Sequence, residues 1–165
     1  MAAYDAFLDN WINNAIATHL PERRTSLSLE DCERLAKLAR EAAIACHVPI
    51  VCSLVDACGQ QRFFFSMDNA LLVSHILAPQ KAWTAVALKM ATHELATRVQ
   101  PGGELYGLDK EKGICCFGGG FPCWSGGCLL GGIGISGGSV EEDMSIARQA
   151  LAQFSALRFP LAITR

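Results

Sequence analysis

The chain lacks the features that mark several large classes of protein. It has no long unbroken apolar run and no basic stretch ahead of an apolar run at its N-terminus, so neither a membrane span nor a signal peptide is expected. The net charge is −2 and basic residues do not cluster beyond Arg23 and Arg24, so no surface for nucleic acid or anionic lipid is indicated. We therefore expect a cytoplasmic protein that binds neither nucleic acid nor membrane.

No C-x-x-C pair occurs, although the chain has eight cysteines. In a reducing compartment such cysteines are more often buried thiols than disulfides. Cys115 and Cys116 are adjacent in an expected strand end and point to opposite faces, which disfavours a shared metal site. The cysteine pattern thus predicts buried thiols and assigns no metal.

Catalytic signatures are also missing. No Ser/His/Asp order or paired-carboxylate spacing stands out, and the four histidines are scattered. A formal G-x-G-x-x-G at Gly132, Gly134 and Gly137 does not predict a dinucleotide site, because the acidic residues 141–143 fill the first turn of the next helix and would repel a pyrophosphate. The sequence therefore favours a binding or structural protein over an enzyme.

Glycine, in contrast, is concentrated in one stretch. Ten of the 15 glycines lie between Cys115 and Asp143. In the strand expected at residues 128–136, Gly132 and Gly134 share one face while Ile133 and Ile135 share the other, so one face of this strand is bare backbone. Another element, such as the last helix, or a flat ligand is expected to pack there.

The rest of the pattern alternates helices with antiparallel strands. Ser28 begins a helix with a capping box, and a hairpin follows at residues 50–56 and 61–66. Further predictions are helices at 70–78 and 80–90 divided by Pro79, one or two helical turns at 92–99, a strand end at 115–117, an irregular turn at 118–122, strands at 123–124 and 128–136, and a last helix from Ser139 with Glu142 in its capping box. This order predicts an α+β fold with helices packed against an antiparallel sheet.

Residues 4–20 carry a separate helical pattern ahead of this body. Their apolar side chains recur at helical spacing, and Pro21 and polar residues then separate them from the rest. Such a helix either packs on its own domain or docks into a groove of a partner. We expect an N-terminal helix and linker at residues 1–26 and a domain at residues 27–165.

Three motifs are similar to those of the GlcG/HbpS family, the DUF336 domain. They are VCSLVDACG at 51–59 for V-x-x-V-V-D-x-x-G; MDNA at 67–70 through Ser74 to KAWTA at 81–85 for M-D-G-A…S…K-A-x-T-A; and GGFP at 119–122 through GISG at 134–137 to Asp143 for G-G-x-P…G-x-G-V-S-G…D. The chain departs from the family in Asn69, in Pro79, in its many cysteines and in residues 1–26.

The resemblance implies a profilin-like α-β-α domain that forms homo-oligomers, commonly octamers, and that binds haem; a flavin or a corrinoid is an alternative cofactor. A haem needs an apolar slot and an axial ligand, for which His75 and His47 are the better candidates and His93 is a weaker one. Lys81 either meets a ligand carboxylate or forms a structural ion pair, and Gly119, Gly120, Phe121 and Pro122 complete the candidate site.

The N-terminal helix resembles the encapsulation peptides of bacterial microcompartment cargo. The leading hypothesis is thus a non-enzymatic haem-binding oligomer that is cargo of a microcompartment, docked to its shell through residues 1–20. A cofactor-free structural or adaptor protein is the second hypothesis, together with a flavin- or corrinoid-linked accessory protein, and an enzyme that acts on a small molecule or flavin is the third.

Overall fold

A four-stranded antiparallel sheet lies at the centre of the protein, in a computed structural model that describes residues 25–158. The strands lie in the order β2-β1-β4-β3, and every neighbouring pair is antiparallel. In chain order the elements are α2 (Leu29–Ala45), β1 (Val51–Asp56), β2 (Gln61–Ser66), α3 (Ser74–Leu88), α4 (Thr92–Arg98), the 3₁₀ turn η1 (Leu108–Lys110), β3 (Gly120–Ser125), β4 (Cys128–Ser136) and α5 (Val140–Arg158). The predicted α+β fold is confirmed.

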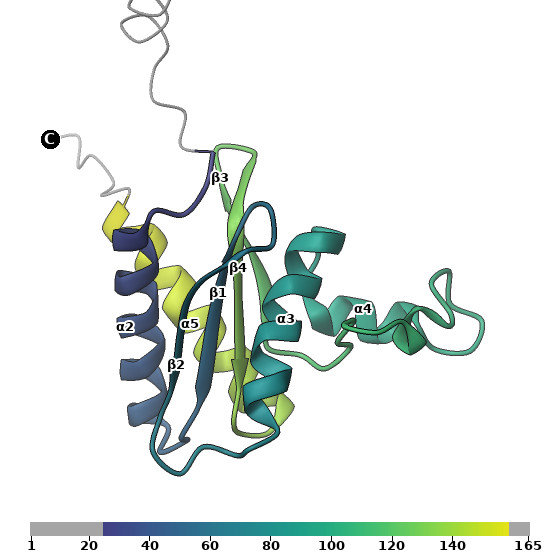
Figure 1. Ribbon diagram of the computed structural model, residues 1–165, viewed down its shortest axis with the longest axis horizontal. Helices are drawn as coiled ribbons and strands as arrows, with labels where there is room; N and C mark the ends of the chain where they lie inside the picture. The colour runs from purple at the N-terminus through teal and green to yellow at the C-terminus, as the bar shows by residue number, and fades with distance from the viewer. Residues whose placement is uncertain (1–24, 159–165) are drawn as a thin grey trace, which may run out of the picture.

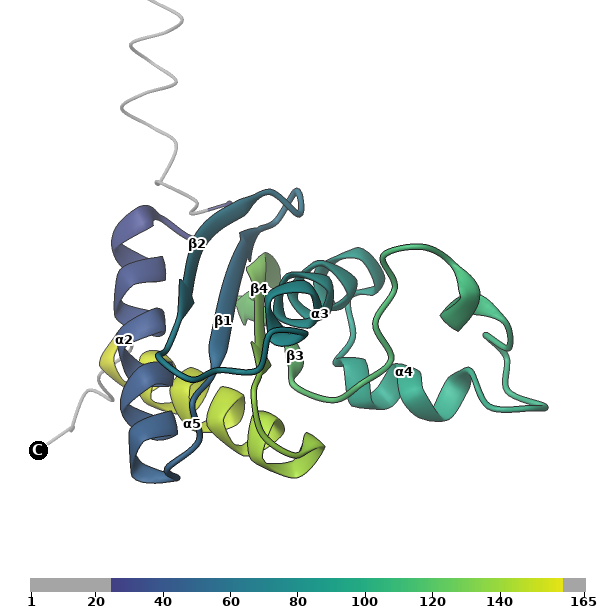
Figure 2. The ribbon, with the colours of Figure 1, turned by 60° about the horizontal axis from the view of Figure 1, so that its bottom comes forward.

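Helices cover both faces of this sheet, which gives three layers (Figures 1 and 2). α2 and α5 lie side by side on one face, and α3 crosses the other face (Figure 1). α4 and the loop that carries η1 extend to one side, past α3 (Figure 2). β2 and β3 are therefore the edge strands of the described sheet. The helix expected at residues 4–20 lies outside the described residues, and the domain boundary at residue 26 stays a prediction.

Local side-chain chemistry begins two helices where the sequence predicts. The Ser28 Oγ accepts from the Asp31 N–H at 3.0 Å, and the Asp31 carboxylate accepts from the Ser28 N–H at 3.2 Å. At the start of α5, the Ser139 N–H donates to the Glu142 carboxylate at 2.8 Å and the Ser139 Oγ accepts from the Glu142 N–H at 3.2 Å. Both capping boxes are confirmed, and each satisfies N–H groups that a helix start leaves unpaired.

The predicted hairpin of β1 and β2 is also confirmed. Its turn is held by Asp56, whose Oδ1 accepts from the N–H groups of Cys58 and Gln60, both at 2.9 Å. The Asp56 carboxylate also lies 3.8 Å from the Arg62 guanidinium. Asp56 thus has the structural role of a turn residue.

The bare face of β4 packs against α3. A Cβ at Gly132 would lie 2.8 Å from Val86 Cγ2 and 2.9 Å from the Ala82 carbonyl oxygen, and a Cβ at Gly134 would collide with the Ala78 carbonyl oxygen. Ile133 and Ile135, on the opposite face, are fully buried in the core that also contains residues of α2 and α5. The expectation that something packs on the glycine face is confirmed, but the last helix is not that element, because α5 lies on the other side of the sheet.

Pro79 does not divide the helix in which it lies. α3 is continuous from Ser74 to Leu88, and residues 70–73, which were predicted as helical, lie before its start. A proline inside a helix costs about 3 kcal/mol because it removes one hydrogen bond and crowds the preceding turn. Here Ala78, Ala82 and Ala85 are all fully buried, so helical residues on both sides of the proline pack against the sheet and offset that cost.

The glycine-rich segment before Pro122 is also more regular than expected. Residues 115–117 form no strand, whereas Gly120, Phe121 and Pro122 pair in register with β4 as the start of β3. Proline is tolerated in an edge strand, since one side of such a strand needs no hydrogen bonds within the sheet. The irregular turn predicted at residues 118–122 is therefore wrong for its last three residues.

Candidate functional site

Lys81 lies in a buried ion pair that joins three elements. Its Nζ donates to the Asp143 Oδ2 and to the Ile135 carbonyl oxygen, both at 2.8 Å, and the two side chains are only 2% and 4% exposed. The Asp143 Oδ1 accepts from the Gly138 N–H at 2.9 Å. Burial raises the pKa of Asp143 above its ordinary 3.8, and the Lys81 ammonium opposes that shift. The pair connects α3, the end of β4 and the start of α5.

Gly119 and Gly120 lie directly against this ion pair. Gly119 has a φ of +116°, and a Cβ there would lie 2.6 Å from the Ile135 carbonyl oxygen and 3.0 Å from Lys81 Nζ. The Gly120 N–H donates to the Thr92 Oγ1 at 2.9 Å, and a Cβ on Gly120 would lie 2.5 Å from the Lys81 carbonyl oxygen. These two glycines thus make room for the ion pair and the adjoining backbone.

His75 lies in a different place, on the surface at the start of α3. Its ring centroid is 5.9 Å from that of Phe64 on β2, with the planes tilted by 46°. The preceding residue, Ser74, is buried, and its Oγ accepts from the Ser136 Oγ at 3.1 Å. That contact holds the first turn of α3 against β4 while the His75 side chain stays exposed.

Several large apolar side chains within four residues of His75 in the chain are exposed rather than buried. Leu72 is 85% exposed and Ile76 is 61% exposed. We define the apolar patch as these two residues with three further exposed ones: Phe64, Leu71 and Val73. A soluble domain rarely leaves so many large apolar side chains together in water unless a ligand or a partner covers them. The apolar patch is the first candidate site.

The other two histidines among residues 25–158 lie elsewhere. His47 is exposed, with a φ of +57°, and follows the C-cap of α2, where its N–H donates to the Ile44 carbonyl oxygen at 3.1 Å. His93 lies in the first turn of α4, with its ring 5.5 Å from Phe121 and its Nε2 3.4 Å from an Nη of Arg148. The Arg148 guanidinium in turn lies 5.4 Å from the centre of the Phe121 ring.

Phe121 and Pro122 are therefore grouped with His93 and not with His75. They line a surface cavity of about 400 Å³ together with His93, Trp124 and Arg148. Phe121 lies on β3 and Phe64 on β2, the two opposite edges of the sheet. Three strand spacings of about 4.8 Å separate those edges. The residues that the motifs suggested as one site are thus divided among a buried ion pair, the apolar patch and this cavity.

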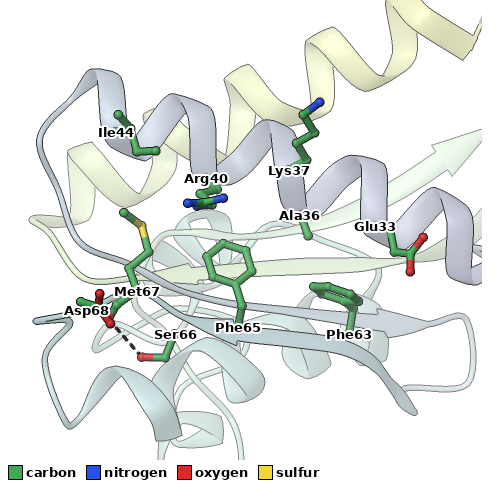
Figure 3. A pocket seen from close by; sticks show the side chains of 10 residues that line it. All are labelled: Glu33, Ala36, Lys37, Arg40, Ile44, Phe63, Phe65, Ser66, Met67 and Asp68. Carbon is green, nitrogen blue, oxygen red and sulfur yellow. Dashed lines mark hydrogen bonds between the residues drawn. The ribbon is translucent and has the colours of Figure 1, made fainter.

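A larger cavity was not foreseen from the sequence. It measures about 570 Å³ and lies between α2 and the edge strand β2. We call it the α2–β2 groove; Figure 3 shows Phe63, Phe65 and Met67 rising side by side from the strand toward α2, and its lining is Glu33, Ala36, Lys37, Arg40, Ile44, Phe63, Phe65, Ser66, Met67 and Asp68. The sequence feature that could have indicated this groove is the alternation of side chains along β2, which places Phe63 and Phe65 on the face opposite Phe64.

The cysteines form no visible metal site. All eight are free thiols, and within residues 25–158 no three side chains of His, Cys, Asp or Glu are grouped so that they could hold a metal ion. Cys32, Cys52, Cys115 and Cys123 are buried, in agreement with the predicted buried thiols, whereas Cys46 and Cys58 are exposed. The helices of this described part include none that is long and apolar enough to cross a membrane.

Fold and motifs together define a class of protein: an α+β domain in which one helix lies on a glycine-faced strand and a buried Lys–Asp pair fixes the helix and strand ends. The chain belongs to the family described as "Haem degrading protein HbpS-like", which it matches over residues 27–152. The family resemblance drawn from the three motifs is confirmed.

Individual relatives agree with this assignment. The corrinoid adenosyltransferase PduO of Citrobacter freundii is 48% identical over 159 residues, which cover 90% of this chain but 48% of that protein. The chain thus spans about half the length of this curated relative. The crystal structure of the PduOC:heme complex is 53% identical with a TM-score of 0.75, covering 77% of this chain and 94% of that one. The Klebsiella pneumoniae protein ORFY is 36% identical with a TM-score of 0.78, covering 82% and 95%.

Proposed function

We propose that the protein binds haem at the apolar patch, with His75 as an axial ligand. The observation that carries the proposal is an exposed imidazole beside an aromatic ring, with four exposed aliphatic side chains within four residues of it in the chain. A haem is a flat apolar macrocycle whose iron takes a histidine as axial ligand, so these residues supply both the surface and the donor that it needs. The similarity to a domain crystallised with haem supports the same ligand.

Lys81 has no place in this proposal as a partner for a haem propionate. Its ammonium is buried and already donates to Asp143 and to a backbone carbonyl, so it would have to break a buried ion pair to meet a ligand. His47 and His93 serve as comparison residues, because neither lies among the side chains of the apolar patch.

We also propose that the protein is a homo-oligomer and that the patch lies at a contact between copies. A haem bound to such an exposed surface keeps one face in water unless a second copy covers it. Covering Leu72 and Ile76 removes apolar area from water at about 25 cal/mol per Å². The rival hypothesis, a cofactor-free structural protein, assigns the patch to that contact alone.

Hemin titration of the purified protein tests the proposal. Binding should saturate at one hemin per subunit or per dimer with a Soret shift, and His75→Ala should abolish that shift or change its position. His47→Ala and His93→Ala are the matched controls and should leave the spectrum unchanged. A spectrum identical to that of free hemin in the unmodified protein would refute haem binding, and an unchanged spectrum of His75→Ala would refute the assigned ligand.

The microcompartment role is a separate proposal. It rests on the resemblance of the N-terminal helix to an encapsulation peptide, and residues 1–20 lie outside the described residues. Its test is co-localisation with a shell. A fluorescent fusion to residues 1–20 should enter a microcompartment, while a fusion in which Phe7 and Trp11 are replaced by aspartate should stay diffuse.

A further inference from the structure

The α2–β2 groove has the properties of a helix-binding surface. Its floor consists of the half-buried side chains Phe63, Phe65 and Met67, and its rim includes Ile44, which is 52% exposed. β2 is an edge strand, with no neighbour on its outer side among residues 25–158. Proteins usually cover such an edge, because its unpaired backbone groups invite pairing with other chains.

The rim of the groove also carries charge. Lys37 and Arg40 lie on α2 at the middle and C-terminal part of the groove, and Glu33 lies nearer the start of the helix (Figure 3). Lys37 is 4.0 Å from Glu41, whereas Arg40 has no ion-pair partner in the part of the chain that the structure describes. An occupant of the groove is therefore expected to bring a carboxylate to Arg40.

We propose that residues 4–20 of the same chain occupy the α2–β2 groove as a helix antiparallel to α2. This segment and α2 are both 17 residues long, so as helices each would span about 25 Å. Its stripe of apolar residues matches the apolar floor, and the stripe consists of Tyr4, Phe7, Leu8, Trp11, Ile12, Ala15, Ile16 and Leu20.

The start of the described chain permits this position. The Leu27 N–H donates to the Leu130 carbonyl oxygen at 2.9 Å, so the chain enters the domain beside β4, two strands away from β2. Two strand spacings are about 10 Å, and five residues from Pro21 to Thr25 can span up to about 16 Å. The connection is thus long enough to reach the groove and short enough to favour the chain's own segment over a partner.

Charge fixes the direction of the helix. When Leu20 lies beside Leu29, the start of α2, antiparallel helices with equal rise place Asp9 beside Arg40. Asp5 lies one turn before Asp9, on the same flank of the apolar stripe. The segment thus supplies the carboxylate that Arg40 lacks.

Cross-linking in the full chain tests the position. The antiparallel arrangement places residue 3 beside Cys46, which is exposed just after α2, and far from Cys58, which is exposed in the turn at the other end of β1. With Ala3→Cys and a short bis-maleimide, we expect an intramolecular link between residues 3 and 46 by peptide mapping. The same variant with Cys46→Ser is the control and should lose that link. A link to Cys58, a link between two chains, or no link to Cys46 would overturn the proposal.

A charge exchange tests the direction independently. Asp9→Lys and Arg40→Asp should each speed amide hydrogen exchange in residues 4–20 by about two- to fivefold, the range expected for an exposed ion pair, and the double variant should restore it. Arg34→Asp is the matched control, since Arg34 is exposed on α2 but does not line the groove. The predicted pair would be refuted if residues 4–20 exchanged at the same rate in the unmodified protein and in all of these variants. The same apolar stripe cannot contact the α2–β2 groove and a microcompartment shell at the same time. Docking to a shell would therefore require residues 4–20 to leave the groove.

Discussion

The buried pair of Lys81 and Asp143 makes the sharpest prediction, because its sequence motif admits both a ligand role and a structural one. Lys81→Met removes the ammonium but keeps a side chain of similar length. The Asp143 carboxylate then loses its cation while it stays 4% exposed. Removing one partner of a buried ion pair typically costs about 3–5 kcal/mol, since the other charge is left uncompensated.

That loss should be measurable by urea unfolding and by thermal melting followed by circular dichroism. For a domain of this size, 1 kcal/mol corresponds to about 2–4 °C, so the melting temperature should fall by roughly 6–20 °C. Lys81→Met combined with Asp143→Asn should be at least about 1 kcal/mol more stable than Lys81→Met alone, because the orphaned charge is gone while Oδ1 can still accept from Gly138.

The effect should also depend on pH. Burial already raises the pKa of Asp143, and loss of the Lys81 ammonium removes what opposes that shift. A group whose pKa is higher in the folded state than in the unfolded state contributes stability at low pH that is lost as the pH rises. Lys81→Met should therefore be less destabilised at pH 5 than at pH 8. If Lys81→Met cost less than about 1 kcal/mol at both pH values and instead weakened hemin binding, the ligand role would be correct and the structural reasoning refuted.

Three further predictions follow from burial and exposure. Gly134→Ala should destabilise the protein by roughly 3 kcal/mol in urea unfolding, since the new methyl group would meet the backbone of α3 at Ala78; wild-type stability would show that α3 does not lie against this strand. Burial raises the pKa of Cys32 to about 11 and that of Cys123 to about 12, so the free energy of unfolding should decrease as the pH rises above 9, where these thiols ionise only in the unfolded chain; a flat profile between pH 9 and 10.5 would contradict this. Leu72→Asp should reduce the mass of the oligomer in light scattering while the melting curve of the subunit stays cooperative; an unchanged mass would place the subunit contact elsewhere.

Structural features that depend on residues close together in the chain could be predicted from the sequence. Each capping box is formed by residues three positions apart, and the hairpin turn around Asp56 is held by hydrogen bonds within four residues. The bare face of β4 was equally readable, because the alternation of a strand places Gly132 and Gly134 together whatever packs on them. Local chemistry of this kind acts the same way in any tertiary context, so the fold class and most element starts could be predicted.

Only the tertiary structure determines which helices and strands pack against each other. The glycines of β4 predict a close contact but do not identify α3 as the element that makes it. Without knowledge of that contact, the sequence does not predict that the helix continues through Pro79. The motifs place these residues in one family pattern along the chain, yet His75 lies near one sheet edge, Phe121 at the other and Lys81 in the interior between layers. The α2–β2 groove depends on how far a helix lies from an edge strand, which is set by the packing of the whole core and by no single stretch of sequence.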